Sequence, residues 1–424
     1  MLNRFGLGSA SQDFLRVSKH SLNYFLGQIL TKSLGFLLIP LYTRFLTPAD
    51  YGILAVVNSL SSVLAIFYTL GQRDAFARFY WDYKDNRREL GELFTTVLVF
   101  VGSISLLFTL GFLFFGKGIL GVLLRGIPFN PYIKLGLLLS FFSIFPTFWL
   151  TLCRNRERSL TYVIATTMSF LLTTALSIYF VVFLRQGALG RLKGQLYVQI
   201  AFTVLSLILL GRESLPRVSA RKLVAGLKYG LPLLPGNLSA WIISLLDRVI
   251  LGGYHGLSSV GVYNVGYAFG GAMGMVATAF NFAYSPYFMK KLTEQGDAAK
   301  TTISRVATLW TAAMVFIAVG ISAFSWEVVH LMTPSAYHDA WKVVPIITLA
   351  FLFQGMYFMS VAPLFYNKKF TRYVPIGIIA GGTVNTLGNF LLIPRYDMMG
   401  AAWATALSYF VMFVITHLLS KRAY

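Results

Sequence analysis

Long apolar stretches separated by short polar connections run along the whole chain. Twelve stretches can be marked, and each is long enough to cross the hydrocarbon core of a bilayer as a helix of about 20 residues. They lie at approximately residues 20–46, 51–72, 93–115, 131–153, 160–184, 192–211, 229–252, 259–288, 303–324, 341–366, 373–394 and 399–419. The pattern predicts an all-α integral membrane protein with about 12 transmembrane helices.

The composition agrees with this prediction. Apolar residues make up 56% of the 424 residues and charged residues only 12%, roughly half of their usual share in soluble domains. So few charges cannot cover the surface of a soluble globular enzyme, and the hydrophobicity is far too high for a disordered chain. The one cysteine, Cys153, allows neither an intramolecular disulfide nor a cysteine metal cluster.

Basic residues are distributed unevenly between the two sides of the membrane. The net charge is +21, and with the N-terminus in the cytoplasm 24 Lys and Arg fall on the inner side, nine on the outer side and three within the segments. This excess predicts an even number of crossings with both termini in the cytoplasm. The bases form no continuous stripe along the chain, so we expect no nucleic-acid partner.

A few ionisable residues fall inside the apolar segments, where an unpartnered charge costs several kcal/mol. Lys32 lies roughly 20 Å along a helix from the inner face, close to the bilayer midplane. Two adjacent pairs, Arg73-Asp74 and Asp247-Arg248, contain the segments' only acids, which makes those acids candidates for coupling to an ion. Because neighbouring residues point about 100° apart on a helix, we expect their partners on other helices.

The charge inside the predicted bundle is positive on balance, and Arg44 adds a further cation at the outer end of the first segment. A cationic cavity suits an anionic ligand such as phosphate or pyrophosphate. Structural ion pairs and snorkelling at helix ends are the alternative for the arginines, whereas Lys32 lies too deep to snorkel easily. Four asparagines are further candidates for polar groups in a cavity: Asn237, Asn281, Asn385 and Asn389.

The sequence offers no set of residues for ordinary catalysis. The histidines share no metal-ligand spacing apart from the loose pair His330 and His338 in a predicted outer loop, and there is no Walker sequence for ATP hydrolysis. The longest connections, at 73–92 and 211–228, are too short to hold an enzyme domain. We therefore expect no enzyme, no bound metal and no cofactor.

Three stretches of the chain carry recognisable motifs. They are Ile39-Pro40-Leu41-Tyr42-Thr43-Arg44-Phe45-Leu46-Thr47-Pro48-Ala49-Asp50-Tyr51-Gly52, then 246–251 with 260–263, and finally 384–385 with 389–394 and 400–405. These stretches resemble, in this order, the first helix and turn, the start of the second half, and the penultimate loop and last helix of the Wzx-type flippases, which belong to the polysaccharide transporter family of the multidrug/oligosaccharidyl-lipid/polysaccharide exporter superfamily. Asp397 departs from the family, in which a glycine is common at this outer turn.

The resemblance implies two six-helix lobes around a central cavity, at 1–211 and 229–424, joined by a cytoplasmic linker at 212–228. It also implies a prokaryotic cytoplasmic membrane, and export of a polyprenyl-pyrophosphate-linked oligosaccharide from the inner to the outer leaflet by alternating access. That transport would serve O-antigen or exopolysaccharide biosynthesis. Its partners would be membrane lipids, a polysaccharide polymerase and glycosyltransferases. The phosphates would bind the cavity cations Lys32, Arg73, Arg248 and Arg44.

Three other functions stay open on the sequence. A multidrug cation antiporter of the same superfamily would favour an acidic cavity, whereas the first segment carries a lysine and no acid. A membrane glycan polymerase or transferase would need acids or a large outer loop to bind sugar and activate a nucleophile. A scaffold without transport activity is the third.

Overall fold

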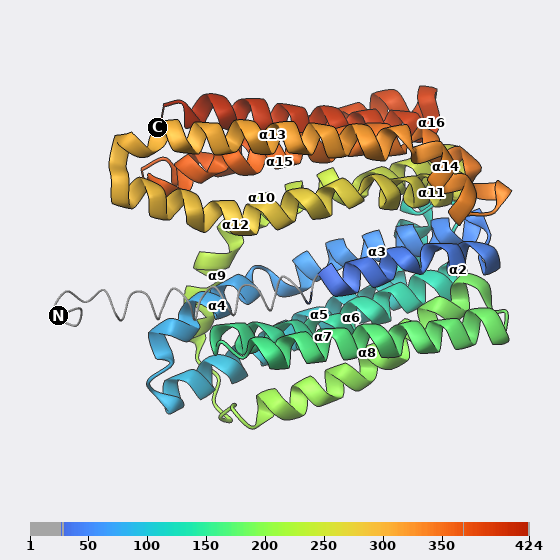
Figure 1. The fold of residues 1–424 in the computed structure, drawn as a ribbon. Helices are drawn as coiled ribbons and strands as arrows, with labels where there is room; N and C mark the ends of the chain where they lie inside the picture. The colour runs from blue at the N-terminus through green and yellow to red at the C-terminus, as the bar shows by residue number, and fades with distance from the viewer. Residues whose placement is uncertain (1–26, 28, 368, 423–424) are drawn as a thin grey trace.

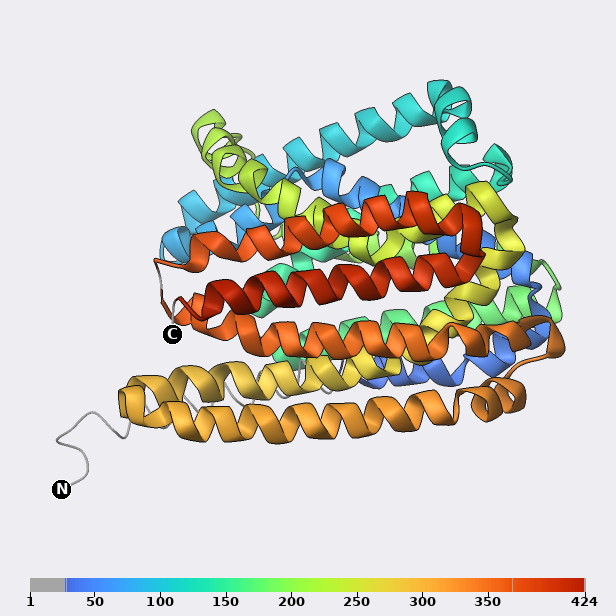
Figure 2. The ribbon, with the colours of Figure 1, turned by 90° about the horizontal axis from the view of Figure 1, so that it is seen from above.

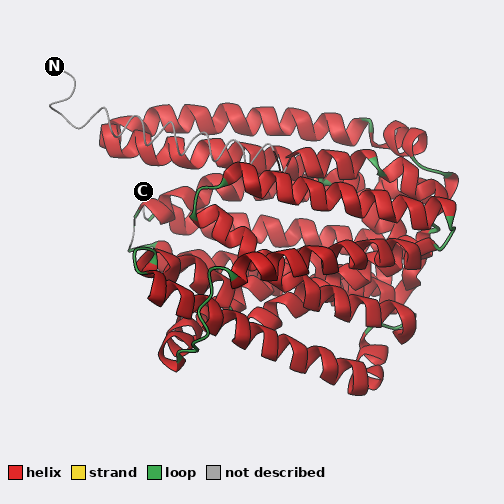
Figure 3. Ribbon diagram, turned by 90° about the horizontal axis from the view of Figure 1, so that it is seen from below, coloured by secondary structure: helices red, strands yellow, loops and turns green. Residues whose placement is uncertain are grey.

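The computed structural model describes residues 27, 29–367 and 369–422. Helices joined by short turns make up this part of the chain, and it contains no strand (Figure 3). The prediction of an all-α protein is confirmed.

Figure 1 shows two lobes, one above the other, formed by the two halves of the chain. The first lobe begins with a helical stretch at 29–37. It continues with α2 (Ile39–Phe45), α3 (Pro48–Thr69), α4 (Gln72–Tyr83), α5 (Arg87–Leu123), α6 (Lys134–Asn155), α7 (Ser159–Ile178) and α8 (Gly187–Gly211). After the connecting helix α9 (Ala220–Gly230), the second lobe contains α10 (Leu234–Trp241), α11 (Asp247–Gly270), α12 (Ala272–Gln295), α13 (Ala299–Ala323), α14 (Ser325–Met332), α15 (Val344–Tyr366) and α16 (Val374–Ser420).

Short helical turns complete these runs. A π-helical turn, η5 (Ile242–Leu246), joins α10 to α11, and the 3₁₀ segment η7 (Ser335–Lys342) joins α14 to α15. The remaining turns are η2 (Phe129–Ile133), η3 (Tyr179–Phe183), η4 (Leu231–Leu233), η6 (Gly296–Ala298) and η8 (Thr371–Tyr373).

Eight helical runs in the described part of the chain are long and apolar enough to cross a membrane. Two of them contain sharp bends, at Gly256 (φ 83°) and Gly296 (φ 52°) in the run Ala220–Ala323, and at Asp397 (φ 52°) in α16. In Figure 2 the two parts of α16 lie side by side and run in opposite directions. Dividing the runs at these bends gives eleven crossings, and the helical stretch through residues 29–45 adds a twelfth. The chain is therefore a multi-pass membrane protein.

The turn between α2 and α3 is fixed by a capping box. The Thr47 hydroxyl accepts a hydrogen bond from the Asp50 backbone N–H (3.2 Å), and the Asp50 carboxylate accepts one from the Thr47 backbone N–H (3.0 Å). The second Asp50 oxygen accepts a hydrogen bond from the backbone N–H of Ala188, at the start of α8 (3.1 Å). The Thr-Pro-Ala-Asp part of the first motif thus holds two turns of the first lobe together.

The two lobes meet closely at this end of the molecule, which we call the closed end. A methyl group placed on Gly52 of α3 would lie 1.9 Å from the Leu257 carbonyl oxygen, and one placed on Gly261 would lie 1.8 Å from the Pro48 carbonyl oxygen. Each glycine comes four residues after the residue that the other touches, so the two contacts mirror each other. Only glycine permits helices to approach so closely.

A tyrosine of the second lobe adds to the seal at the closed end. The Tyr337 hydroxyl, from η7, donates a hydrogen bond to the Leu46 carbonyl oxygen (2.8 Å). Its ring meets the Tyr51 ring edge-on, with the centroids 5.7 Å apart. Both contacts connect the α2–α3 turn to the second lobe.

The opposite end, which we call the linker end, holds α4, α9 and the last turn of α16, and the lobes diverge toward it (Figure 1). Helix α9 packs on the first lobe, where the Lys222 ammonium pairs with Glu89 (2.7 Å) and Glu92 (2.9 Å) of α5. At the end of α9, Gly230 contacts the backbone of Gly71, so closely that neither position has room for a side chain. Part of the predicted 212–228 linker is thus an ordered helix.

Candidate functional site

A cavity of about 530 Å³ lies between the two lobes, and residues of both lobes line it. The first lobe contributes residues from the first helical stretch, α2, α3 and α8, and the second lobe contributes residues from η5, α11, α12, α15 and α16. The polar and aromatic members are Lys32, Phe36, Tyr42, Tyr51, Arg191, Ser244, Asn264, Tyr267, Thr278, Phe351, Gln354 and Tyr409. A site that both lobes share can respond when one lobe moves relative to the other.

Two cations face this cavity, Lys32 and Arg191. Among the residues that the structure describes, no carboxylate lies within ion-pairing distance of either, and the cavity lining contains no Asp or Glu. The Arg191 guanidinium lies over the Tyr42 ring, 4.1 Å from its centroid, and 5.9 Å from the centroid of Tyr51. The aromatic rings orient the guanidinium without neutralising its charge.

Sequence reasoning missed Arg191. It began the sixth segment at residue 192 and so assigned Arg191 to an outer connection, whereas α8 begins at Gly187. The polar residues around it, Arg185, Gln186 and Lys193, lower the local hydropathy and hide the first turn of the helix. A boundary set a few residues earlier would have counted Arg191 among the charges within the segments.

Arg248 and Asp247 lie behind the cavity wall. Their exposed fractions are 2% and 0%, and Arg248 Nη1 lies 2.6 Å from Asp247 Oδ1. The same guanidinium donates to the Ser244 carbonyl oxygen (2.5 Å) and lies over the Tyr267 ring, 4.1 Å from its centroid. Arg248 therefore supports the tyrosine that faces the cavity and is itself withdrawn from it.

The expectation that the partners of these charges lie on other helices was wrong for the ion pairs, since each arginine pairs with the acid next to it in sequence, although Asp74 also accepts a hydrogen bond from Asn237 of α10. The long arginine side chain folds back along its own helix and reaches the neighbouring carboxylate. In Asp247-Arg248, burial makes that neutralisation necessary, because a lone charge in this dry position would cost several kcal/mol. In Arg73-Asp74 the two groups are 3.4 Å apart and partly exposed.

Arg73, Asp74 and Asn237 line a second, smaller cavity of about 260 Å³ near the linker end. It lies between α3, α4 and α6 of the first lobe and α10 of the second, and the Asn237 amide donates to Asp74 at 3.5 Å. It shares no lining residue with the central cavity. The structure therefore separates Arg73 from Lys32 rather than bringing the two together.

The other predicted site residues lie outside both cavities. Arg44 is exposed in the last turn of α2, and Asn281 is half-buried on α12. Asn385 and Asn389 are fully buried one turn apart in α16 and share one hydrogen bond (2.8 Å). The asparagine that lines the central cavity is Asn264, which the sequence did not single out.

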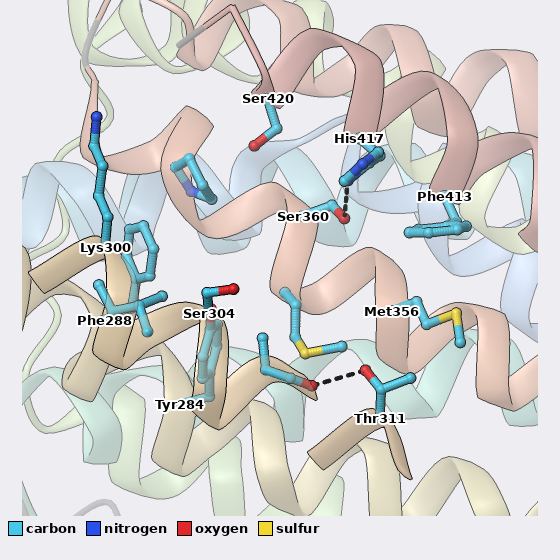
Figure 4. Close-up of a pocket in the computed structure, with 14 residues that line it drawn as sticks. Tyr284, Phe288, Lys300, Ser304, Thr311, Met356, Ser360, Phe413, His417 and Ser420 are labelled. Carbon is cyan, nitrogen blue, oxygen red and sulfur yellow. Dashed lines mark hydrogen bonds between the residues drawn. The ribbon is translucent and has the colours of Figure 1, made fainter. Parts of the chain in front are cut away.

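A third cavity, of about 380 Å³, lies within the second lobe near the linker end (Figure 4). Several of its polar side chains have partners in the lobe itself: His417 faces Ser360 at 3.5 Å, Thr311 donates to the Ala307 carbonyl oxygen, and Lys300 pairs with Asp297 at 2.9 Å. Since only one lobe lines it, lobe movement would not change its access from one side of the membrane to the other.

Comparison with known proteins finds similarity both in sequence and in fold. The profile of the family described as "Polysaccharide biosynthesis protein" matches residues 17–291. The uncharacterized membrane protein MJ1068 of Methanocaldococcus jannaschii is 23% identical, over 94% of this chain and 82% of its own.

Solved transporter structures share the fold over most of their length. The lipid II flippase MurJ, in an inward closed conformation, has a TM-score of 0.74 at 14% identity, over 95% of this chain and 87% of its own. A multidrug resistance MATE family transporter of the MOP superfamily, in an inward-facing conformation, has a TM-score of 0.71 at 15% identity, over 92% and 94% of the two chains. The two-lobe arrangement around a central cavity is therefore a transporter fold.

Proposed function

Because the chain belongs to the polysaccharide biosynthesis protein family and has a transporter fold, we propose that it is a flippase for a polyprenyl-pyrophosphate-linked oligosaccharide. The observation that carries this proposal is the pair of cations, Lys32 and Arg191, in a cavity that both lobes line and that contains no acid. The pyrophosphate would bind these two cations. The sugars would lie against the tyrosine rings and hydrogen-bond to the neighbouring amides.

Electrostatics favours this substrate over an organic cation. Holding a charged side chain at bilayer depth costs several kcal/mol unless it meets a counter-charge or water, and an anionic headgroup supplies the counter-charge. An organic cation in the same cavity would be repelled by Lys32 and Arg191 with no carboxylate to offset them. The multidrug antiporter is therefore the weaker candidate, although the fold is shared.

The proposed transport is alternating access. The headgroup would enter from the linker end, which the Lys and Arg excess assigns to the cytoplasm, while the contacts of Gly52, Gly261 and Tyr337 keep the closed end sealed. Rocking of the lobes would then break these contacts and release the headgroup into the outer leaflet of a prokaryotic cytoplasmic membrane. Glycosyltransferases would supply the substrate and a polymerase would use the product.

Coupling to an ion would fall to Asp74 rather than Asp247. Asp74 lines the smaller cavity and its side chain is 32% exposed, so a cation can reach it. Asp247 is fully buried and already pairs with Arg248. Binding of a cation at Asp74 would release Arg73 of the same helix and would break the hydrogen bond from Asn237, which connects the two lobes at the linker end.

The test is binding of a fluorescent polyprenyl pyrophosphate to the purified protein in nanodiscs. We expect Lys32→Gln and Arg191→Gln each to weaken binding by about tenfold, the loss of one charge-assisted contact. Arg44→Gln is the matched control, because Arg44 is exposed and lies outside the cavities. Unchanged binding in both cavity variants would refute the proposed headgroup site, and tighter binding of an organic cation than of the pyrophosphate would favour the antiporter.

A further inference from the structure

A groove of about 620 Å³ runs between α7 and α8 on the first lobe, separate from the transport cavity. Its walls come from one face of each helix: Thr161, Ile164, Ala165, Met168, Leu172 and Leu176 of α7, opposite residues 197–205 of α8. The spacing of three and four residues shows that these faces point at each other along several turns. They face each other without meeting, since the groove lies between them.

The groove forms because the two helices approach at one end only. Near the closed end, methyl groups placed on Gly194 and Gly190 would lie 2.8 Å from the Ser177 backbone nitrogen and 3.0 Å from Phe180. Toward the linker end, larger residues replace the glycines and the helices separate. Trp149 of α6 forms the floor, only 9% exposed, with its ring edge-on to Phe202.

The rim of the groove is too apolar to face water. Ile164, Met168 and Tyr197 are 55%, 51% and 51% exposed, and in a multi-pass membrane protein such residues lie in the hydrocarbon. A wedge of this kind between membrane helices would be filled by a hydrocarbon chain, since an empty wedge would lose dispersion contacts on both walls.

Three arginines lie beyond the end of the groove nearest the linker end. Arg158 precedes Thr161 by three residues, Arg154 follows Trp149 by five, and Arg212 follows Leu205 by seven, which are axial rises of roughly 5 to 10 Å. All three are exposed, and in the described residues none of them forms an ion pair.

The neighbouring arginine, Arg156, has a different role. It pairs with Glu213 through two hydrogen bonds of 2.6 and 2.8 Å, which connect the α6–α7 turn to the end of α8. This pair holds the two sides of the rim together and occupies Glu213, which leaves Glu157 of the same turn as the one other acid against three arginines, Arg154, Arg158 and Arg212. The remaining arginines are left with a net positive charge directly beyond an apolar groove.

We propose that this groove and its arginine rim bind one anionic phospholipid of the leaflet at the linker end. One acyl chain lies between α7 and α8 over Trp149, and the phosphate contacts Arg154, Arg158 and Arg212. The lipid is a resident ligand and not the transported molecule, because the groove lies within one lobe and shares no lining residue with the central cavity. The proposal does not depend on the proposed transport function.

Native mass spectrometry of the purified full chain in nanodiscs tests this proposal, with phosphatidylglycerol and phosphatidylcholine as the two probes. We expect the wild-type chain to retain one phosphatidylglycerol molecule about tenfold more strongly than phosphatidylcholine. The double variant Arg154→Gln with Arg158→Gln should lose that preference, while Arg395→Gln, an exposed arginine at the closed end, should keep it.

A second variant separates the chain site from the headgroup site. Ala165→Phe with Ala201→Phe fills the groove from both walls and should lower retention of both lipids, with the arginine rim intact. Equal retention of the two lipids by the wild-type chain would overturn the arginine rim as a headgroup site. Unchanged retention in the filled variant would overturn the groove as the chain site.

Discussion

The mirrored glycine contact at the closed end leads to a sharp prediction for Gly261→Ala. The new methyl group would lie 1.8 Å from the Pro48 carbonyl oxygen, whereas carbon and oxygen in contact are normally about 3.3 Å or more apart. The helices must therefore separate by roughly 1.5 Å at this crossing. Overpacking of this kind costs about 1–3 kcal/mol.

This cost falls mainly on the conformation in which the closed end is sealed. If the alternative conformation separates α3 from α11, the substitution shifts the equilibrium toward it by about fivefold to 150-fold, since 1.4 kcal/mol corresponds to tenfold. Gly52→Ala should act in the same direction, because its methyl group would lie 1.9 Å from the Leu257 carbonyl oxygen.

Cysteine accessibility measures this shift. The chain's single cysteine, Cys153, is buried, so Asn264→Cys in the central cavity can serve as the reporter for a membrane-impermeant maleimide added at the closed end. We expect Gly261→Ala to raise the labelling rate by at least fivefold.

The matched control is Gly253→Ala on the same helix, where an added methyl group meets nothing within 4 Å. Alanine is a better helix former than glycine by about 1 kcal/mol, so this control should leave the labelling rate unchanged and raise the thermal stability slightly. Labelling of a folded Gly261→Ala protein at the wild-type rate would refute the reasoning.

Three further predictions concern stability. Asp247→Asn should lower the free energy of unfolding by about 3–5 kcal/mol, because it leaves the buried Arg248 charge uncompensated. Replacement of both residues by apolar ones should lower the free energy of unfolding by less, and thermal melts of the two variants would show the difference. Asp397→Ala should destabilise more than Asp397→Gly in the same assay. Both variants lose the hydrogen bond that the Asp397 carboxylate accepts from the Ser259 hydroxyl, but only alanine keeps the backbone strain at φ 52°. The hydrogen bond from Arg156 lowers the pKa of Glu213 in the folded protein. The Arg156–Glu213 pair therefore stabilises the fold at pH values above the usual glutamate pKa, and this stabilisation is lost as the pH falls below that value. Arg156→Gln should accordingly flatten the acid side of a profile of melting temperature against pH.

Hydropathy predicts most of this fold because the bilayer imposes it. Each crossing must satisfy its own backbone hydrogen bonds, so a long apolar stretch leaves helix as the only stable choice. The bends at Gly256 and Asp397 lie in the polar gaps between predicted segments, and at each of them non-helical backbone separates two helices. Segment number was therefore easier to predict than segment ends.

The site was harder to predict because it depends on which way each helix faces. Lys32 and Arg248 look alike in sequence, since both are basic residues within apolar segments, yet one faces the cavity and the other is sealed behind Tyr267. No local pattern distinguishes them, because the rotation of each helix is set by packing against distant parts of the chain. Arg248 was predicted to face the cavity but does not, whereas Arg191 faces the cavity but was not predicted, because the predicted segment began one residue after it.

The packing of α9 on the first lobe determines where the hinge between the two lobes can lie. Because Lys222 pairs with two glutamates of α5, the connecting helix moves with the first lobe as one rigid unit and does not act as a flexible linker. Rotation of one lobe relative to the other at this end must therefore occur in the few peptide units after Gly230. There the backbones of Gly230 and Gly71 are in contact, and the prolines of η4 and α10 restrict the backbone dihedral angles. A hinge so short and so closely packed would restrict the lobes to rotation about a single axis.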